Sequence, residues 1–258
     1  MNILAIETSG RYCGVSIFRA NAVVKSIVDQ SPLSHSTVVL EMIERVLCQS
    51  AVAWDALNAI AVTRGPGSFT GLRIGIAVAQ GLAFARNLPI VPISSLAQVA
   101  LAARRAQRSL SDADSRECEP LAVDRAFALI DARMGEVYAG CYDIRSASPV
   151  LCGDERVIAP QKMGAYLDLL VEKRCLFVGS GLVHHSDFPA DIIACDSGEY
   201  PGISTDSQRA VLDASACEPH PELLALLAAD AYTAGFYCSA GALAPTYLRN
   251  RVTHSTAR

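Results

Sequence analysis

Hydrophobic and polar positions change their period several times along the first part of the chain. Short apolar runs separated by turn residues come first, and they predict three antiparallel strands in a meander. Over 36–48 the apolar residues recur at helical spacing, with Glu41 and Arg45 on the opposite face. The pattern predicts strands over 3–7, 14–18, 23–28, 59–63 and 90–93, and helices over 36–48, 70–86 and from Ser94 or Ser95 to Arg105. This mixture indicates an α/β fold.

The periodic pattern fades between Arg104 and Arg125, where charges of both signs mix with serine, aspartate and proline. Such a segment is typical of an exposed linker. The 258 residues are enough for two domains of ordinary size. We therefore expect an N-terminal domain over 1–105, a linker over 106–125 and a C-terminal domain over 126–258.

The second half opens like the first, with a strand, an acid, a turn and another strand. When 129–135 is laid over 5–11, Asp131 coincides with Glu7 without a gap. Strand–turn–strand units are common, so the match alone does not establish a duplication. The remaining predicted elements are strands over 137–142, near Val157 and over 175–178, helices over 160–172 and 221–238, and a loop-rich stretch over 186–221. We expect the final helix to pack back near the domain junction.

Composition narrows the classes of function. Hydrophobic residues make up 51% and charged residues 19%, so the chain can bury a sizeable core. The net charge of -4 offers no excess of cations with which to grip nucleic acid, so any such role would depend on a partner. Arg249, Arg251, His254 and Arg258 make a weakly basic tail, which is read as solvated, with contact to RNA or an acidic partner as the alternative.

The nine cysteines are scattered and never spaced as C-x-x-C, which argues against a disulfide framework and a zinc ribbon. Most have apolar neighbours, as buried thiols do. The longest apolar stretch, Leu72 to Ala85, contains Arg73 and Gln80 and is too short to span a bilayer. With no signal-peptide pattern at the start, we expect a reduced, cytoplasmic protein with no membrane contact.

A glycine-rich run precedes the helix predicted over 70–86. A strand that enters such a turn and opens a helix points backbone N–H groups at one place, which can hold an anion such as phosphate. The lysine of a P-loop is missing. The equally weighted alternative is that the glycines permit a tight turn and close packing. The candidate anion-binding residues are Gly65, Gly67, Ser68, Thr70 and Gly71.

The helix after this loop is apolar on every side. Gly71, Gly75 and Ala79 recur every four residues and make one face nearly flat, so that another helix can approach closely. A sheet covers one side only, and the rest is covered either by a neighbouring helix of the same chain or by a second protein. Burial of this helix within its own chain is the simpler expectation, and a surface that binds a second protein is the more specific alternative.

Few residues suggest catalysis. Glu7 and Asp131 stand at strand ends, where an acid can support a metal-bound nucleotide in sugar-kinase and actin-like folds or merely cap a turn. The histidines do not form H-x-x-x-H or H-E-x-x-H, so no metal site is expected. No G-x-S-x-G elbow is present. An independent enzyme is therefore hard to build from this sequence.

Five segments together carry a family resemblance. They are I-L-A-I-E-T-S over 3–9, His35-Ser36, G-P-G-S-F-T-G-L-R-I-G over 65–75, D-A-R-M-G-E-V-Y over 131–138 and P-T-Y-L-R over 245–249. They span nearly the whole chain, and the longest is too specific for chance agreement. The sequence resembles the bacterial TsaB (YeaZ) family of tRNA threonylcarbamoyladenosine biosynthesis proteins.

The resemblance implies an actin/hexokinase-like (ASKHA) fold of two related domains with mixed sheets flanked by helices. It also implies a non-catalytic partner of the paralogue TsaD, which transfers threonylcarbamoyl to N6 of adenosine 37 in tRNA, in a complex with the small ATPase TsaE. TsaD carries metal-binding histidines on the helix that corresponds to 36–48, whereas this chain has only His35 near its start. The alternative is an ASKHA-type nucleotide-binding ATPase or phosphotransferase, suggested by the glycine-rich loop and the two acids.

Family members pair through the helix near His35 and the helix after the glycine-rich loop, with TsaD or with a second copy when alone. The resemblance thus implies no cofactor of its own, ATP or ADP only within the complex, and contact with tRNA only through it. One departure is Glu7, where many relatives have Asp, so no nucleotide role is assigned to it. The expected interface residues are His35, Val38, Val39, Met42, Val46, Gly71, Leu72, Gly75, Ile76 and Ala79.

Overall fold

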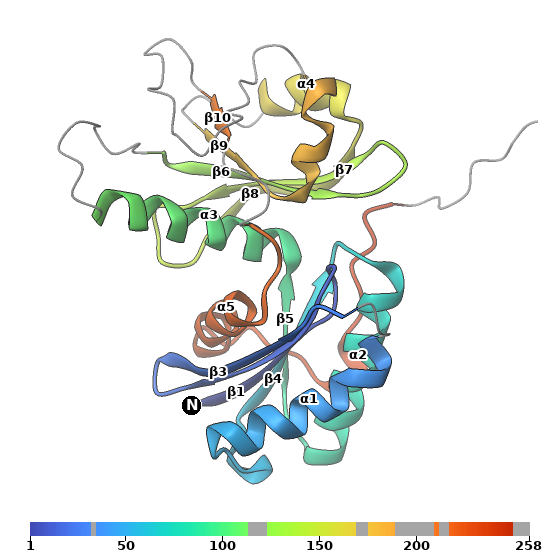
Figure 1. Cartoon of the computed structure of the whole chain (residues 1–258), viewed down its shortest axis with the longest axis vertical. Helices are drawn as coiled ribbons and strands as arrows, with labels where there is room; N and C mark the ends of the chain where they lie inside the picture. Colours follow the sequence, from blue (N-terminus) through green and yellow to red (C-terminus); the bar gives the residue numbers. More distant parts are fainter. Residues whose placement is uncertain (32–34, 113–122, 169–174, 189–208, 212–216, 250–258) are drawn as a thin grey trace, which may run out of the picture.

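A computed structural model describes residues 1–31, 35–112, 123–168, 175–188, 209–211 and 217–249. Two five-stranded sheets form its framework (Figure 1). The first sheet has the order β3-β2-β1-β4-β5, with β1 Asn2–Glu7, β2 Cys13–Arg19, β3 Ala22–Asp29, β4 Ala59–Gly65 and β5 Ile90–Ser94. The second has the order β10-β9-β6-β7-β8, with β6 Arg125–Asp131, β7 Val137–Asp143, β8 Val150–Ile158, β9 Cys175–Val178 and β10 Arg209–Val211.

The two sheets share one topology. In each, the first three strands pair antiparallel, and the first strand then pairs in parallel with the fourth, which is followed by the fifth. The antiparallel meander at the start of each half follows the predicted strands closely. The predicted fold of two related halves with mixed sheets flanked by helices is confirmed.

Alternation along β1 gives the first sheet two buried faces. Leu4 and Ile6 pack with α1 (His35–Ser50) and α2 (Phe69–Arg86), whereas Ile3 and Ala5 pack with α5 (Pro221–Thr233). Figure 1 shows α1 and α2 together on one side of this sheet and α5 on the other. The outward surface of the N-terminal half is therefore made by α1 and α2.

The second sheet is built on the same alternation, along β6. Ala126 and Ala128 pack with α3 (Ser95–Asp112), whereas Phe127 and Leu129 pack on the other face among residues of α4 (Met163–Asp168) and η3 (Ser180–Asp187). The helix α3 thus follows the first sheet in sequence and covers the second. Short 3₁₀ turns complete the described elements: η1 Trp54–Ala56, η2 Pro160–Lys162 and η5 Ala240–Ala242.

Two expected helix ends are wrong, at α3 and at α5. The helix expected to end at Arg105 runs to Asp112, and Gln107 in the added part donates to the Val123 carbonyl at 3.5 Å, so the expected linker begins as helix. The helix expected over 160–172 is a 3₁₀ turn followed by α4, and residues 169–174 lie outside the described part. Most of the loop-rich stretch over 186–221 also lies outside it.

The second wrong helix end is that of α5, at Thr233 rather than at residue 238. Gly235 has a φ of 84° and donates its amide to the Tyr232 carbonyl at 3.0 Å, while the Phe236 amide bonds the Ala231 carbonyl at 2.8 Å. This pair of bonds is a Schellman motif, which ends a helix at a glycine. Although α5 comes late in the sequence, it packs on the first sheet and also touches α3.

Candidate functional site

The glycine-rich loop joins β4 to α2 and is bound by three other parts of the chain. The contacts run from the Ser68 amide to the Ser9 carbonyl (2.8 Å), from the Ser95 hydroxyl to the Pro66 carbonyl, and from the Thr246 amide to the Arg64 carbonyl (2.7 Å). The Ser68 hydroxyl caps α2 by accepting the Gly71 amide at 3.2 Å. Two amides of the predicted anion-binding set are thus used within the chain, and anion binding by this loop stays a prediction.

Close packing against the turn after β1 explains why this loop has glycines. A β-carbon at Gly67 would lie 2.6 Å from the Ser9 carbonyl oxygen, and one at Gly71 would overlap the Thr8 carbonyl. The Thr8 hydroxyl donates to the Gly71 carbonyl at 2.8 Å. The turn after β1 therefore rests directly on the first turn of α2, with no room for side chains between them.

Glu7 is 2% exposed, and both of its carboxylate oxygens accept hydrogen bonds from the chain. Oε1 accepts from the Ser9 amide (2.7 Å) and hydroxyl (2.6 Å), and Oε2 accepts from the Thr63 hydroxyl and from Gln98 Nε2 (2.8 Å). The Gln98 carbonyl oxygen in turn accepts the His220 amide at 3.0 Å. Glu7 therefore joins β1, β4, α3 and the start of α5.

Asp131, the matching acid of the second half, is more open, with its side chain 21% exposed. Its Oδ1 accepts the Arg133 amide at 2.8 Å and lies 3.2 Å from His184 Nε2. The Arg133 guanidinium lies 3.4 Å from Oδ2. Although the two acids coincide in topology, Glu7 is buried in a network of neutral donors, whereas Asp131 pairs with a cation at the surface.

The expected interface helices are present, but the flat stripe faces inward. A β-carbon at Gly75 would overlap the Thr8 hydroxyl and lie 3.5 Å from Val62, and Ala79 is 0% exposed. The first sheet occupies the face that was expected to receive a partner. The expected interface residues that are buried within this chain are Val39, Met42, Val46, Gly71, Leu72, Gly75, Ile76 and Ala79, while His35 and Val38 are partly exposed.

Other residues make up the outward faces of the two helices. On α1, Leu40 is 54% exposed, and on α2, Phe84 is 85% exposed. Ala77, Gly81 and Ala85, spaced four residues apart on α2, are also exposed, and a β-carbon at Gly81 would meet nothing within 4 Å. A second small-residue stripe therefore faces outward, and it was missed because both stripes have the same spacing.

The sequence also missed the contacts of the segment after α5. Tyr247 packs against Phe69 with the rings tilted and 5.6 Å between their centroids, and it accepts a hydrogen bond from Arg73 Nε at 3.0 Å. Arg249, expected to be solvated, pairs with Glu136 of the second half, and its side chain is only 16% exposed. This segment ties the start of α2 to the turn after β6. The residues of the tail beyond 249 lie outside the described part.

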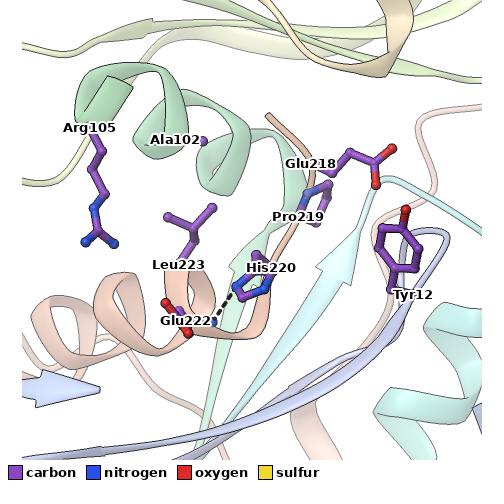
Figure 2. Close-up of a pocket in the computed structure, with 8 residues that line it drawn as sticks. All are labelled: Tyr12, Ala102, Arg105, Glu218, Pro219, His220, Glu222 and Leu223. Atoms are coloured by element: carbon purple, nitrogen blue, oxygen red, sulfur yellow. Dashed lines mark hydrogen bonds between the residues drawn. The ribbon is translucent and has the colours of Figure 1, made fainter. Parts of the chain in front are cut away.

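A cavity of about 330 Å³ opens between the two halves (Figure 2). Its lining combines Tyr12 from the turn before β2, Ala102 and Arg105 from α3, and the segment that leads into α5. His220 at its edge caps α5, with Nδ1 accepting the Glu222 amide at 3.3 Å. The histidine therefore has a structural role, and no part of this cavity was expected from the sequence.

Comparison with known proteins identifies the family. The sequence profile described as "TsaD: tRNA N6-adenosine threonylcarbamoyltransferase" matches residues 30–255. The tRNA threonylcarbamoyladenosine biosynthesis protein TsaB of Escherichia coli is 30% identical, over 98% of this chain and 96% of that protein. The chain belongs to the TsaB family. TsaB of Bacillus subtilis is 28% identical, over 96% of this chain and 94% of that protein.

Solved structures agree with the TsaB assignment. YeaZ from Pseudomonas aeruginosa aligns with a TM-score of 0.74 and 32% identity, over 96% of this chain and 99% of that one. A tRNA N6-adenosine threonylcarbamoyltransferase of Streptococcus suis is 34% identical over 40% of this chain and 35% of that protein. This TsaB-family chain is therefore also related in sequence to the transferases.

Neither a metal-binding cluster nor a membrane-spanning helix occurs among the described residues. Within that part, no three His, Cys, Asp or Glu side chains come together in a way that could hold a metal ion. None of its helices is both long and apolar enough to cross a bilayer.

Proposed function

We propose that this chain is the non-catalytic partner of a TsaD-like transferase in the formation of threonylcarbamoyladenosine at position 37 of tRNA. We place its partner surface on the outer faces of α1 and α2. The proposal is supported by full-length relatives named for this biosynthesis and by the match to the TsaD profile over 30–255.

The observation that carries the proposed surface is the composition of the outer helix faces. Leu40 and Phe84 expose large apolar side chains, and Ala77, Gly81 and Ala85 leave α2 without bulk between them. Small residues let a second helix approach closely, while exposed apolar side chains gain from being covered. This combination suits helix-to-helix packing with another protein.

The sequence relationship between this chain and the TsaD-like transferases supports a twofold-like arrangement of the two proteins. Two related chains can associate about a pseudo-twofold axis, in which the same elements of each meet. The same surface would then accept a second copy of this chain when the transferase is absent. We accordingly propose a homodimer for the isolated protein and a heterodimer in the complex.

The polar groups of the chain fit a supporting role. The carboxylate of Glu7 accepts four hydrogen bonds from its own chain, and α1 contains a single histidine, His35, at its first position. We propose that the chain has no cofactor of its own, that ATP or ADP binds only within the complex, and that tRNA and a TsaE-like ATPase are met there.

Reconstitution tests the role directly. We would measure threonylcarbamoylation of tRNA by the TsaD-like transferase, together with the TsaE-like ATPase, in the presence and absence of this chain. The proposal expects modification to depend on the chain. Equal modification without it would show that the proposed role is wrong.

A matched pair of variants tests the surface. Leu40→Glu places a charge on the outer face of α1, whereas Val150→Glu places one at a residue of similar exposure, 58%, on β8. Burying an unpaired charge in an interface weakens binding strongly, so Leu40→Glu should weaken association with the transferase about tenfold or more. Val150→Glu should leave it unchanged. Light scattering or calorimetry measures both, and equal affinities would move the interface elsewhere.

Gly81 provides a second test on α2. Gly81→Leu adds bulk where the isolated chain has open space, so it should weaken the complex without unfolding the protein. The same change at Gly75 would press on Thr8 and test the fold instead. Association of the Gly81 variant at parental affinity would contradict the proposed helix contact.

A further inference from the structure

Two cysteines face each other across the second sheet. Cys141 on β7 and Cys152 on β8 are partners in the antiparallel register. Residues directly opposite in such a pair have Cα atoms about 4.5–5.5 Å apart and side chains on the same face. Disulfides span Cα distances of about 4.4–6.8 Å. The backbone therefore already holds the two residues at a separation that a disulfide can bridge.

The two thiols share one environment. Both contact the same hydrophobic cluster beneath β7 and β8, where Cys141 is 0% exposed and Cys152 is partly exposed. The Cys152 sulfur lies 3.6 Å from the Val150 carbonyl oxygen. One thiol can therefore be reached from solvent, and its partner lies directly behind it.

We propose that Cys141 and Cys152 form a reversible disulfide, with Cys152 as the thiol that reacts first and Cys141 as the thiol that closes the bond. The proposal is independent of the partner surface on α1 and α2. It assigns the pair as a site of oxidative modification by small-molecule disulfides such as oxidised glutathione.

The thiol–disulfide exchange proceeds in two steps, in which atoms and electrons are conserved. The Cys152 thiolate attacks one sulfur of oxidised glutathione, the glutathione S–S bond breaks, and one glutathione leaves as a thiolate that takes up a proton. The Cys141 thiolate then attacks Cys152 Sγ in the mixed disulfide and releases the second glutathione. In sum, two protein thiols are oxidised, one glutathione disulfide is reduced, and two glutathione thiols are formed.

Burial makes the second step slow at neutral pH. In the reduced chain burial raises the pKa of the Cys141 thiol to about 11, while the Arg125 guanidinium acts in the opposite direction. Cys152 also adds to the rise while it is a thiol, and burial, the largest cause, remains once it carries glutathione. Because the thiolate is the nucleophile, closure should quicken about tenfold per pH unit below that pKa. The mixed disulfide on Cys152 should therefore be visible as an intermediate at neutral pH.

The bond would lie beside a structural joint. The register of β7 with β8 shifts just after Cys152, and Gly153 there has a φ of 82°. In the shifted segment, Glu155 accepts hydrogen bonds from the Tyr142 and Ser94 hydroxyls, which connects the second sheet to the end of β5. A disulfide would hold the edge strand at this joint and should raise the thermal midpoint of unfolding.

The experiment uses the full chain. The protein is incubated with oxidised or reduced glutathione, alkylated and digested with trypsin, which cleaves at Arg145 and so separates Cys141 and Cys152 into different peptides. The expected product with oxidised glutathione is peptide 134–145 linked to peptide 146–156. Cys48, exposed on α1, should carry only glutathione.

Serine variants separate the two roles. Cys141→Ser should accumulate glutathione on Cys152, and Cys152→Ser should leave Cys141 free for alkylation after denaturation. Cys48→Ser should form the linked peptide as the parent does. Parental protein with both thiols alkylated, or with either cysteine linked to another residue, would overturn the proposal.

Discussion

Replacing Glu7 with glutamine tests whether this buried acid is a structural clamp. The Glu7 carboxylate acts only as an acceptor in its four hydrogen bonds. One oxygen accepts from the Ser9 amide and hydroxyl, and the other accepts from Thr63 and Gln98. A carboxamide has one acceptor oxygen and one NH₂ donor. Whichever way it is placed, its NH₂ meets a fixed N–H donor, either the Ser9 amide or Gln98 Nε2.

The size of the effect follows from this mismatch. Turning Gln98 over would free one contact, but its carbonyl oxygen already accepts the His220 amide at 3.0 Å. At least one buried donor therefore loses its partner, and the remaining bonds lose the charge of the acceptor. Each loss costs roughly 1–3 kcal/mol, so we expect Glu7→Gln to lower the free energy of unfolding by about 3 kcal/mol.

Urea denaturation followed by circular dichroism measures the change, provided that the slope with denaturant stays the same. Glu41→Gln is the control, because Glu41 is 72% exposed and its contact with Arg45 is 3.9 Å long. That variant should stay within about 0.5 kcal/mol of the parent. A loss below about 1 kcal/mol for Glu7→Gln would refute the clamp.

Two further predictions concern α2 and the second sheet. Gly75→Ala should lower the free energy of unfolding by about 1–3 kcal/mol, because its β-carbon would overlap the Thr8 hydroxyl. Gly81→Ala, in open space, should raise the free energy of unfolding by about 0.5–1 kcal/mol. Changes of the same sign in urea denaturation would contradict this prediction. Burial and the neighbouring Glu155 raise the pKa of Tyr142 well above 10.0. The unfolded chain releases that proton near pH 10.0 and the folded chain does not, so stability should fall as pH rises past it, and Tyr142→Phe should flatten the fall in unfolding measured against pH.

The elements that the sequence predicts well are those with strong local signals. The meander of β1 to β3, the helix α2 and the strand–acid–turn–strand of β6 and β7 all follow from apolar runs and turn residues. The boundaries that differ are decided elsewhere. Beyond Arg105, α3 contacts the second half through Gln107, which donates to the Val123 carbonyl, and α5 ends early because Gly235 takes a positive φ.

The expected interface shows the limit of a local pattern. A spacing of four residues places Gly71, Gly75 and Ala79 on one face, and it places Ala77, Gly81 and Ala85 on another. Sequence spacing says that each stripe is flat, but not which one meets the sheet. The contact of Gly71 and Gly75 with Thr8 decides this, and Thr8 lies more than sixty residues away in the chain.

The sequence alone determined the α/β class and the family, because these depend on periodicity and on short motifs whose residues are neighbours in the chain. The two related halves were expected from the family resemblance, and the topology of the two sheets established them. Only the tertiary structure decided which helix faces remain outside, how Glu7 is bound and that Cys141 lies opposite Cys152. Each of these depends on residues far apart in sequence, brought together by strand register and by the burial of apolar faces, and local patterns carry no record of such contacts.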